Sequence, residues 1–235
     1  MIVVFTSLAA AAPDPSGLRD TATTLGAGEV VVRLPTGRSA VGLGERTEVW
    51  VTPIDAGLGG TRIGMEQRLL DRGAVAWSVT PSVGQKWSGG RTSVRLATTV
   101  STTWRQSRVN LTVAPELGWL REVALGEARS STFGPSRLHV PVEVAYDHLF
   151  ERAIVRGTVR AWTLDEGEPL TYGVTTLSWI HQWGRVFTEL GAGLLVGRPS
   201  EHHFLGRYQT TLVVPYPRLD LWLQLGRPAN GRSDR

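Results

Sequence analysis

Polar side chains recur at every second position in several apolar segments of the sequence, and the charged ones among them are the residues best placed to do chemistry. Arginine and glutamate alternate with valine, leucine and tryptophan, so one side of each segment carries charge and the other is apolar. Charges of both signs on one face could line a water-filled channel or neutralise one another in a closed interior. The residues predicted to line such an interior are Glu48, Arg62, Glu66, Arg68, Arg91, Arg95, Arg108, Glu116, Glu143, Arg156, Arg160, Glu189, Arg207 and Asp220.

The pattern leaves open what this interior does. Long arginine and glutamate side chains could bridge a modest cavity and close it, or they could line a channel for small polar solutes. If the interior conducts, the excess of arginine predicts a mild preference for anions. Lys86 is the only lysine among the 25 basic residues, and the arginines are spread along the chain. We therefore expect no nucleic-acid partner, despite the net charge of +4.

Histidine and serine offer little for metal binding or catalysis. His202 and His203 follow Glu201, but adjacent side chains of a strand point apart and two ligands do not complete a metal site. His148 and Ser178 could serve a membrane-embedded lipid hydrolase, yet the sequence has no Gly-x-Ser-x-Gly motif. We therefore expect no catalytic residue, no metal and no cofactor, and keep the hydrolase as a further alternative.

The elements that must position the charged residues are β-strands. Regular alternation predicts strands over 91–104, 108–119, 137–147 and 218–225. A change of phase between Val174 and Leu177 predicts a β-bulge. Weaker segments that we also predict to be strands are 47–53, 60–70, 74–84, 153–163, 170–181, 185–196 and 204–215.

These strands predict an all-β fold, an antiparallel up-and-down transmembrane β-barrel. The strand number is roughly 10 to 13, with about 12 favoured, depending on whether residues 35–38 form a turn or a bulge. Longer links are expected near 54–60, 85–91, 120–136, 164–169 and 197–204, and short turns on one rim with long loops on the other are typical of outer-membrane barrels. The tight turns are predicted at 44–47, 71–73, 105–107, 151–152, 183–185 and 215–218.

Tryptophan is abundant, with 9 residues, and most of them fall near the ends of predicted strands. An aromatic girdle at a membrane interface would place them there, whereas a soluble protein would bury them in its core. The residues predicted to form this girdle are Trp50, Trp77, Trp104, Trp119, Trp162, Trp179 and Trp183.

The ends of the chain differ in composition from the segments between them. Residues 1–12 are apolar and end in alanines, which predicts a signal peptide, followed by an N-terminal segment over 13–27. The barrel is predicted over 28–226 and a polar tail over 227–235. The 235 residues include no cysteine and no apolar run of about 18 residues, so a membrane-spanning form would use strands.

The stretch Leu25–Val32, followed by Val41–Trp50, resembles the opening strand and first tight turn of uncharacterised, porin-like outer-membrane β-barrel proteins of Gram-negative bacteria. The resemblance implies location in a Gram-negative outer membrane and contact with its lipid, and it carries over no functional residue. The chain departs from the commonest pattern of that group, because its last predicted strand ends at Leu225–Gly226 and a polar tail replaces a terminal aromatic residue.

Two functions from different classes fit these features. The one we favour is a porin-like passive channel or structural membrane protein without catalysis. The alternative is a secreted soluble β-barrel or sandwich that binds an apolar ligand. The two differ in which face is buried, because a soluble barrel would pack the valines inside and expose Arg95, Arg108 and Glu143 to water.

Overall fold

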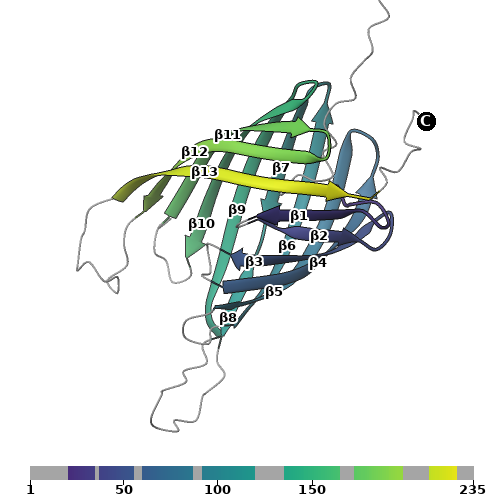
Figure 1. The fold of residues 1–235 in the computed structure, drawn as a ribbon. Coiled ribbons are helices and arrows are strands. Elements are labelled where there is room, and N and C mark those ends of the chain that lie inside the picture. The colour runs from purple at the N-terminus through teal and green to yellow at the C-terminus, as the bar shows by residue number, and fades with distance from the viewer. Residues whose placement is uncertain are drawn as a thin grey trace, which may run out of the picture.

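The protein is built from β-strands alone in the part of the chain that the structure, a computed structural model, describes: residues 21–34, 37–55, 60–86, 92–119, 135–164, 172–197 and 212–226 (Figure 1). Within these residues no helix has the length and apolar character to cross a membrane. The strands are β1 (Val30–Leu34), β2 (Ser39–Gly42), β3 (Thr47–Asp55), β4 (Gly60–Asp71), β5 (Val75–Lys86), β6 (Thr92–Trp104), β7 (Ser107–Val113), β8 (Glu116–Trp119), β9 (Pro135–Leu149), β10 (Ala153–Leu164), β11 (Tyr172–Trp183), β12 (Val186–Gly197) and β13 (Leu212–Leu225).

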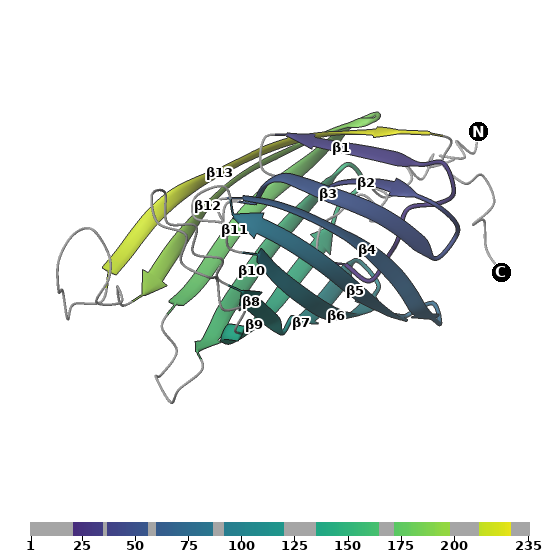
Figure 2. The same cartoon turned by 90° about the horizontal axis from the view of Figure 1, so that it is seen from below.

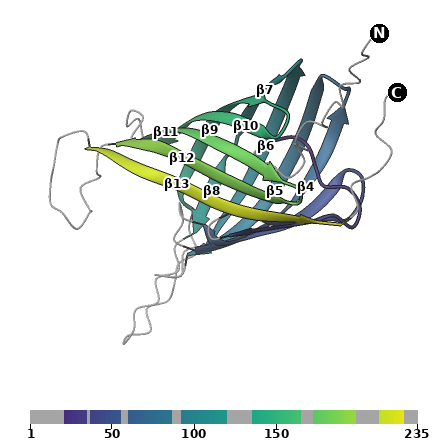
Figure 3. The same cartoon turned by 45° about the horizontal axis from the view of Figure 1, so that its top comes forward.

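The strands form one closed antiparallel barrel in which each strand pairs with its neighbours in sequence. The β9–β10 pairing continues the wall into β11, β12 and β13 (Figure 3). β13 pairs with β1, which completes the circle (Figure 1). β7 and β8 are two halves of one strand, because both pair with β6 and with β9 and only Ala114 and Pro115 separate them. The wall therefore has 12 strands, and the predicted all-β up-and-down barrel is confirmed.

Pro115, and no change of register, explains why the strand is interrupted at this join. Ala114 donates to Pro141 and the Pro115 carbonyl accepts from Leu96, so both residues keep the alignment of their neighbours. Proline lacks an N–H and cannot donate to the ladder, which breaks the regular pattern at that point.

Tight turns lie on one rim of the barrel. Residues 43–46, 72–74, 105–106, 150–152 and 184–185 connect successive strands there. Backbone with positive φ makes these reversals possible at Gly73 (65°), Arg105 (53°) and Gly184 (65°). The predicted short links on this rim agree with the structure except at 215–218. The strands that flank the predicted long links have their ends at the opposite rim.

The first two strands are much shorter than the others. β1 pairs with β13 only from Val30 to Leu34, and β2 pairs with β3 only from Ser39 to Gly42 (Figure 2). Because β1 and β2 are an antiparallel pair, the segment 28–43 holds two strands and residues 35–38 connect them. The barrel wall is therefore complete near the tight-turn rim and interrupted above this hairpin, as far as the described residues go.

Side chains on the two faces of the wall have opposite character. In β6, Ser93, Thr99 and Ser101 are buried inside, whereas Val94 and Leu96 are exposed outside. The same alternation holds in the other long strands, so the outer surface is apolar and the interior is polar and charged. The exposed large residues on the outer face include Ile63, Val83, Leu111, Val144, Val159, Leu177, Leu190 and Leu219.

An apolar cluster fills the interior near the tight-turn rim. Leu25, from the segment before β1, is buried among inward-facing side chains of both ends of the chain. Phe187 and Trp222 stack at the centre of this cluster, with ring centroids 5.2 Å apart. The other members are Val31, Ala40, Trp50, Ile154 and Ile180. We call this cluster the apolar floor.

Several predictions from the sequence are wrong. Residues 215–218 lie inside β13 and form no turn. Of the predicted strand 204–215, residues 212–215 belong to β13, and residues 204–211 lie outside the described residues. β11 keeps one continuous register with β10 and β12, so it has no bulge; Val174 and Ile180 simply face inward. Bulges occur instead in β3, β4 and at the β8–β9 pairing.

The tryptophans divide between the two faces of the wall. Trp77, Trp104, Trp179 and Trp183 are exposed on the outer face near the tight-turn rim, where the predicted girdle would place them. Trp50 is buried inside the barrel, so its predicted place in the girdle is wrong. The side chains of Trp119 and Trp162, the predicted signal peptide and the polar tail lie outside the described residues.

Candidate functional site in the barrel interior

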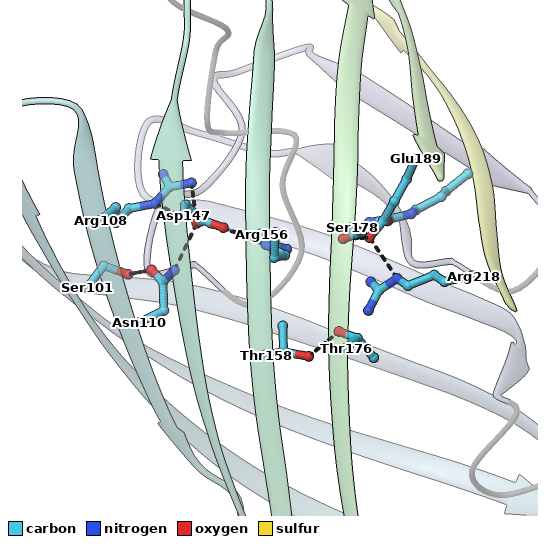
Figure 4. Close-up of polar contacts among 11 residues, drawn as sticks. Ser101, Arg108, Asn110, Asp147, Arg156, Thr158, Thr176, Ser178, Glu189 and Arg218 are labelled. Carbon is cyan, nitrogen blue, oxygen red and sulfur yellow. Dashed lines mark hydrogen bonds and ion pairs between the residues drawn. The ribbon is translucent and has the colours of Figure 1, made fainter. Parts of the chain in front are cut away.

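The most deeply buried charges gather around Asp147 on β9, which is fully inaccessible to solvent (Figure 4). Arg156 of β10 donates to one carboxylate oxygen from Nε at 2.6 Å, and Arg108 of β7 donates to the other from Nε at 3.1 Å and Nη2 at 3.0 Å. Asn110 donates to the same oxygen at 3.1 Å and accepts from Ser101 Oγ at 2.7 Å. One carboxylate thus links three neighbouring strands on the inner face of the wall.

A second group of charges surrounds Glu189 on β12. Its Oε1 accepts from Ser178 Oγ and pairs with Arg218 Nε, each at 2.7 Å, and its Oε2 pairs with Arg33 Nη2 at 2.8 Å. Arg33 also donates from Nε to Asp220 at 2.6 Å. This group joins β1 to β12 and β13, so it closes the barrel where the two ends of the chain meet.

A third group bridges two carboxylates that the strand register places opposite one another. Glu48 on β3 lies directly opposite Glu66 on β4 in the strand register, and like charges in that arrangement repel. Arg38 lies between them, with Nη2 contacting Glu48 and lying 2.6 Å from Glu66. Nearby, Arg62 pairs with Glu116 at 2.7 Å. Each of these carboxylates therefore has a cationic partner.

Two of these arginines also lie over tryptophan rings. Arg33 is 4.3 Å from the ring centroid of Trp222, and Arg38 is 4.7 Å from that of Trp50. A guanidinium at this distance is attracted to the ring face. Arg33 and Arg38 therefore pack directly against the tryptophans of the apolar floor, and these contacts help to fix the positions of both.

The segment before β1 enters this interior. The Ala22 N–H donates to Ser101 Oγ at 2.8 Å, and the Leu25 N–H donates to Glu48 Oε2 at 2.9 Å. Thr24 Oγ1 donates to the carbonyl of Glu45 at 3.3 Å. Buried backbone N–H groups need such partners. The polar interior therefore supplies the hydrogen-bond acceptors that the segment requires to lie inside the barrel.

The described residues enclose a small polar cavity among these groups. A polar cavity of about 50 Å³ lies beside the third group, and a water molecule needs roughly 10–15 Å³ of such space. It has room for a few waters and is too small for a solute. Its lining includes Arg38, Thr52, Arg62, Glu66, Arg95 and Thr99.

The structure places most of the predicted interior residues on the inner face. Arg160 contacts Glu143, and Arg68 pairs with Asp71 at 2.8 Å near the tight-turn rim. Arg91 and Arg207 lie outside the described residues. The predicted residues that are buried are Glu48, Arg62, Glu66, Arg68, Arg108, Glu143, Arg156, Glu189 and Asp220, and those that are half-buried are Arg95, Glu116 and Arg160.

Four charged residues at the centres of these groups were missing from the predicted set. Asp147 lies on the polar face of a predicted strand, so alternation could have found it. Arg33 and Arg38 lie in and after a short strand, where alternation has too few residues to be read. Arg218 belongs to the residues predicted to form a turn. Their roles depend on partners from distant strands.

The serine and histidine considered for catalysis lie on opposite faces of the wall. Ser178 is buried inside and bonds Glu189, whereas His148 faces outward on β9. The nearest serine to His148 is Ser107, whose Oγ is 3.5 Å from Nδ1 and 3.0 Å from the hydroxyl of Tyr146. A nucleophile and its base normally lie about 2.6–3.2 Å apart. No group of three potential metal ligands occurs among the described residues, and His202 and His203 are not among them.

Comparison with known proteins adds no family to this description. No protein-family model matches the chain, and no curated protein matches it at a significant level. Fold and site therefore define the class: a closed 12-strand antiparallel β-barrel with an ion-paired interior and an apolar exterior.

Proposed function

We propose that this protein is a transmembrane β-barrel of a Gram-negative outer membrane that has a structural role, is closed to solutes and performs no catalysis. The observation that carries the proposal is the inverted distribution of side chains. Leu190 and Leu219 are 67% and 72% exposed at mid-strand, while Asp147, Glu189 and Arg156 are buried. An apolar band around a polar interior is what a barrel in lipid requires, because its outer surface meets hydrocarbon.

The soluble alternative is less consistent with this distribution. A soluble barrel turns its large apolar residues inward, and a monomeric soluble protein rarely exposes a continuous apolar surface of this extent. Charged residues in such a protein would meet water, whereas here they pair with one another inside the wall.

The ion-paired interior supports a structural role rather than a passive channel. Ion pairs join neighbouring and next-nearest strands along the inner face, Leu25 lies within the apolar floor, and the cavity beside Arg38 is about 50 Å³. These features support a barrel that does not conduct small polar solutes in this conformation.

Fractionation tests the membrane location directly. We expect the protein to remain in the outer-membrane pellet after a carbonate wash and to require detergent for release. Recovery in the soluble fraction without detergent would contradict the proposal.

A charge on the outer surface tests which solvent that surface meets. Leu190→Arg should lower the free energy of unfolding by about 2–4 kcal/mol in lipid vesicles, because arginine at mid-membrane is costly. Leu43→Arg is the matched control, since Leu43 is 63% exposed in a tight turn at the rim. An equal, small effect of both substitutions would indicate that water surrounds position 190.

Conductance separates a closed barrel from a channel. In a planar bilayer at high salt we expect insertion of the purified protein to give no steady current. A stable open conductance with anion preference would favour the porin-like alternative instead.

A further inference from the structure

Residues 21–26, which we call the inner segment, lie inside the barrel without belonging to its wall. None of them is part of a strand, although Thr21 and Leu25 are only 3% and 1% exposed. Thr21 lines the polar cavity beside Arg38, and Thr24 contacts the tight turn at the rim through the carbonyl of Glu45. The inner segment therefore occupies the space between the polar cavity and the tight-turn rim.

The inner segment also connects two sides of the barrel. The Ala22 N–H bonds Ser101 on β6 at 2.8 Å. Leu25 belongs to the apolar floor, whose other members come from β1, β2 and β3 and from β10 to β13. A piece of chain that reaches from β6 to this floor obstructs the interior near the tight-turn rim.

The wall does not need the inner segment to satisfy its own polar groups. Two side chains accept hydrogen bonds from the segment's backbone toward the wall, and each has a second partner in the barrel. Ser101 donates to Asn110 at 2.7 Å, as Figure 4 shows, and Glu48 contacts Arg38. Because buried polar groups need partners, these contacts allow the segment to leave without orphaning either side chain. The segment contributes nothing to the strand ladder, so the ladder is also kept.

Gly42 on β2 lies directly against the inner segment. An added Cβ at this position would lie 2.0 Å from the carbonyl oxygen of Gly26 and 3.0 Å from that of Leu25. These atoms belong to the backbone, which cannot turn aside as the end of a flexible side chain does. An alanine at position 42 and the docked segment therefore exclude one another.

We propose that the inner segment is a removable plug, and that the barrel passes small ions and polar solutes when the plug leaves. Its departure joins the polar cavity to the tight-turn rim along a path beside Arg38, Glu48 and Ser101. Charged and hydroxyl groups around a water-filled path admit ions and small polar molecules. The inference rests on the proposed closed membrane barrel, and it assigns the closure to the plug rather than to the wall alone.

Conductance of the full chain in a planar bilayer at high salt tests the plug. We expect no steady current from the wild type and a steady current from Gly42→Ala, whose added Cβ displaces the segment at Gly26. Gly44→Ala is the matched control, because an added Cβ there meets no neighbouring atom within 4 Å. This control should be as silent as the wild type.

A reversible cross-link distinguishes a displaced plug from a damaged wall. The chain contains no cysteine, so Ala22→Cys combined with Ser101→Cys supplies the only pair that can form a disulfide. Added to Gly42→Ala, this pair should abolish the current under oxidising conditions, and a reductant should restore it. A current that persists with the disulfide formed, as mass spectrometry verifies, would place the leak in the wall and overturn the inference.

The remaining outcomes separate this inference from the closed-barrel proposal. A silent Gly42→Ala beside a silent wild type overturns the plug and leaves the closed barrel standing. A steady current from the wild type overturns both. A heat-dependent shift in gel mobility reports whether each variant is folded. If Gly42→Ala does not fold, Leu25→Asp replaces it, because it places a charge in the apolar floor, and Leu43→Asp at the exposed rim becomes the control.

Discussion

Replacement of Asp147 by asparagine tests whether paired charges hold the interior together. The carboxylate accepts two hydrogen bonds from Arg108, two from Arg156 and one from Asn110. Asparagine keeps the size of the side chain, but it removes the negative charge and places an NH₂ donor among groups that are themselves donors. Arg108 and Arg156 then remain buried without their carboxylate.

The expected magnitude follows from burial. Asp147, Arg108 and Arg156 are at most 2% exposed, so water cannot solvate the two guanidinium groups in place of the lost carboxylate. Removing one partner of a buried ion pair costs about 3–5 kcal/mol, because it leaves an uncompensated charge. We therefore expect Asp147→Asn to lower the free energy of unfolding by about 3–5 kcal/mol.

Urea titration in detergent micelles, followed by tryptophan fluorescence, measures this loss. Glu151→Gln is the control, since Glu151 is exposed in a tight turn and its amide should change stability by less than about 0.5 kcal/mol. Adding Arg108→Met to Asp147→Asn should restore part of the lost stability, because it removes one of the two buried cations left without a carboxylate. A loss below about 1 kcal/mol for Asp147→Asn, or no recovery in the double variant, would refute the reasoning.

Two further predictions concern the apolar floor. Leu25→Ala should lower the free energy of unfolding by about 2–5 kcal/mol through loss of burial and a new cavity, whereas Leu43→Ala at the exposed rim should leave it nearly unchanged in the same urea titration. Gly64→Ala should lower the free energy of unfolding by about 1–3 kcal/mol, because an added Cβ would lie 2.5 Å from the ring of Trp50. Gly157→Ala is the control, since an added Cβ there would meet no neighbouring atom within 4 Å. An equal melting temperature for the two variants would contradict the packing of Trp50.

Alternation predicted the strands well wherever a strand is long. Over β6 it separated the exposed Val94 and Leu96 from the buried Ser93 and Ser101, because successive side chains of a strand lie on opposite faces. The tight turns at 105–106 and 184–185 could be predicted equally well from the sequence, since they fall where alternation stops. The approximate strand number followed from the spacing of these breaks.

Prediction failed where a residue's local preference and its tertiary role differ. Pro215 and Pro217 favour a turn locally, but they are tolerated inside β13 because their missing N–H groups lie on an edge without a partner. Val174 and Ile180 resemble outward-facing residues, yet Ile180 belongs to the apolar floor. The segment around Leu25 has no periodicity, so nothing local places it inside the barrel.

The sequence by itself determined that the chain forms two-faced strands, because a period of two is a local property of the backbone. Only the tertiary structure decided which charges meet. Asp147 joins Arg156, 9 residues away, and Arg108, 39 residues away, because both strands flank β9 in the closed wall. Closure and register set these partners, and they also decide that the charged face lies inside.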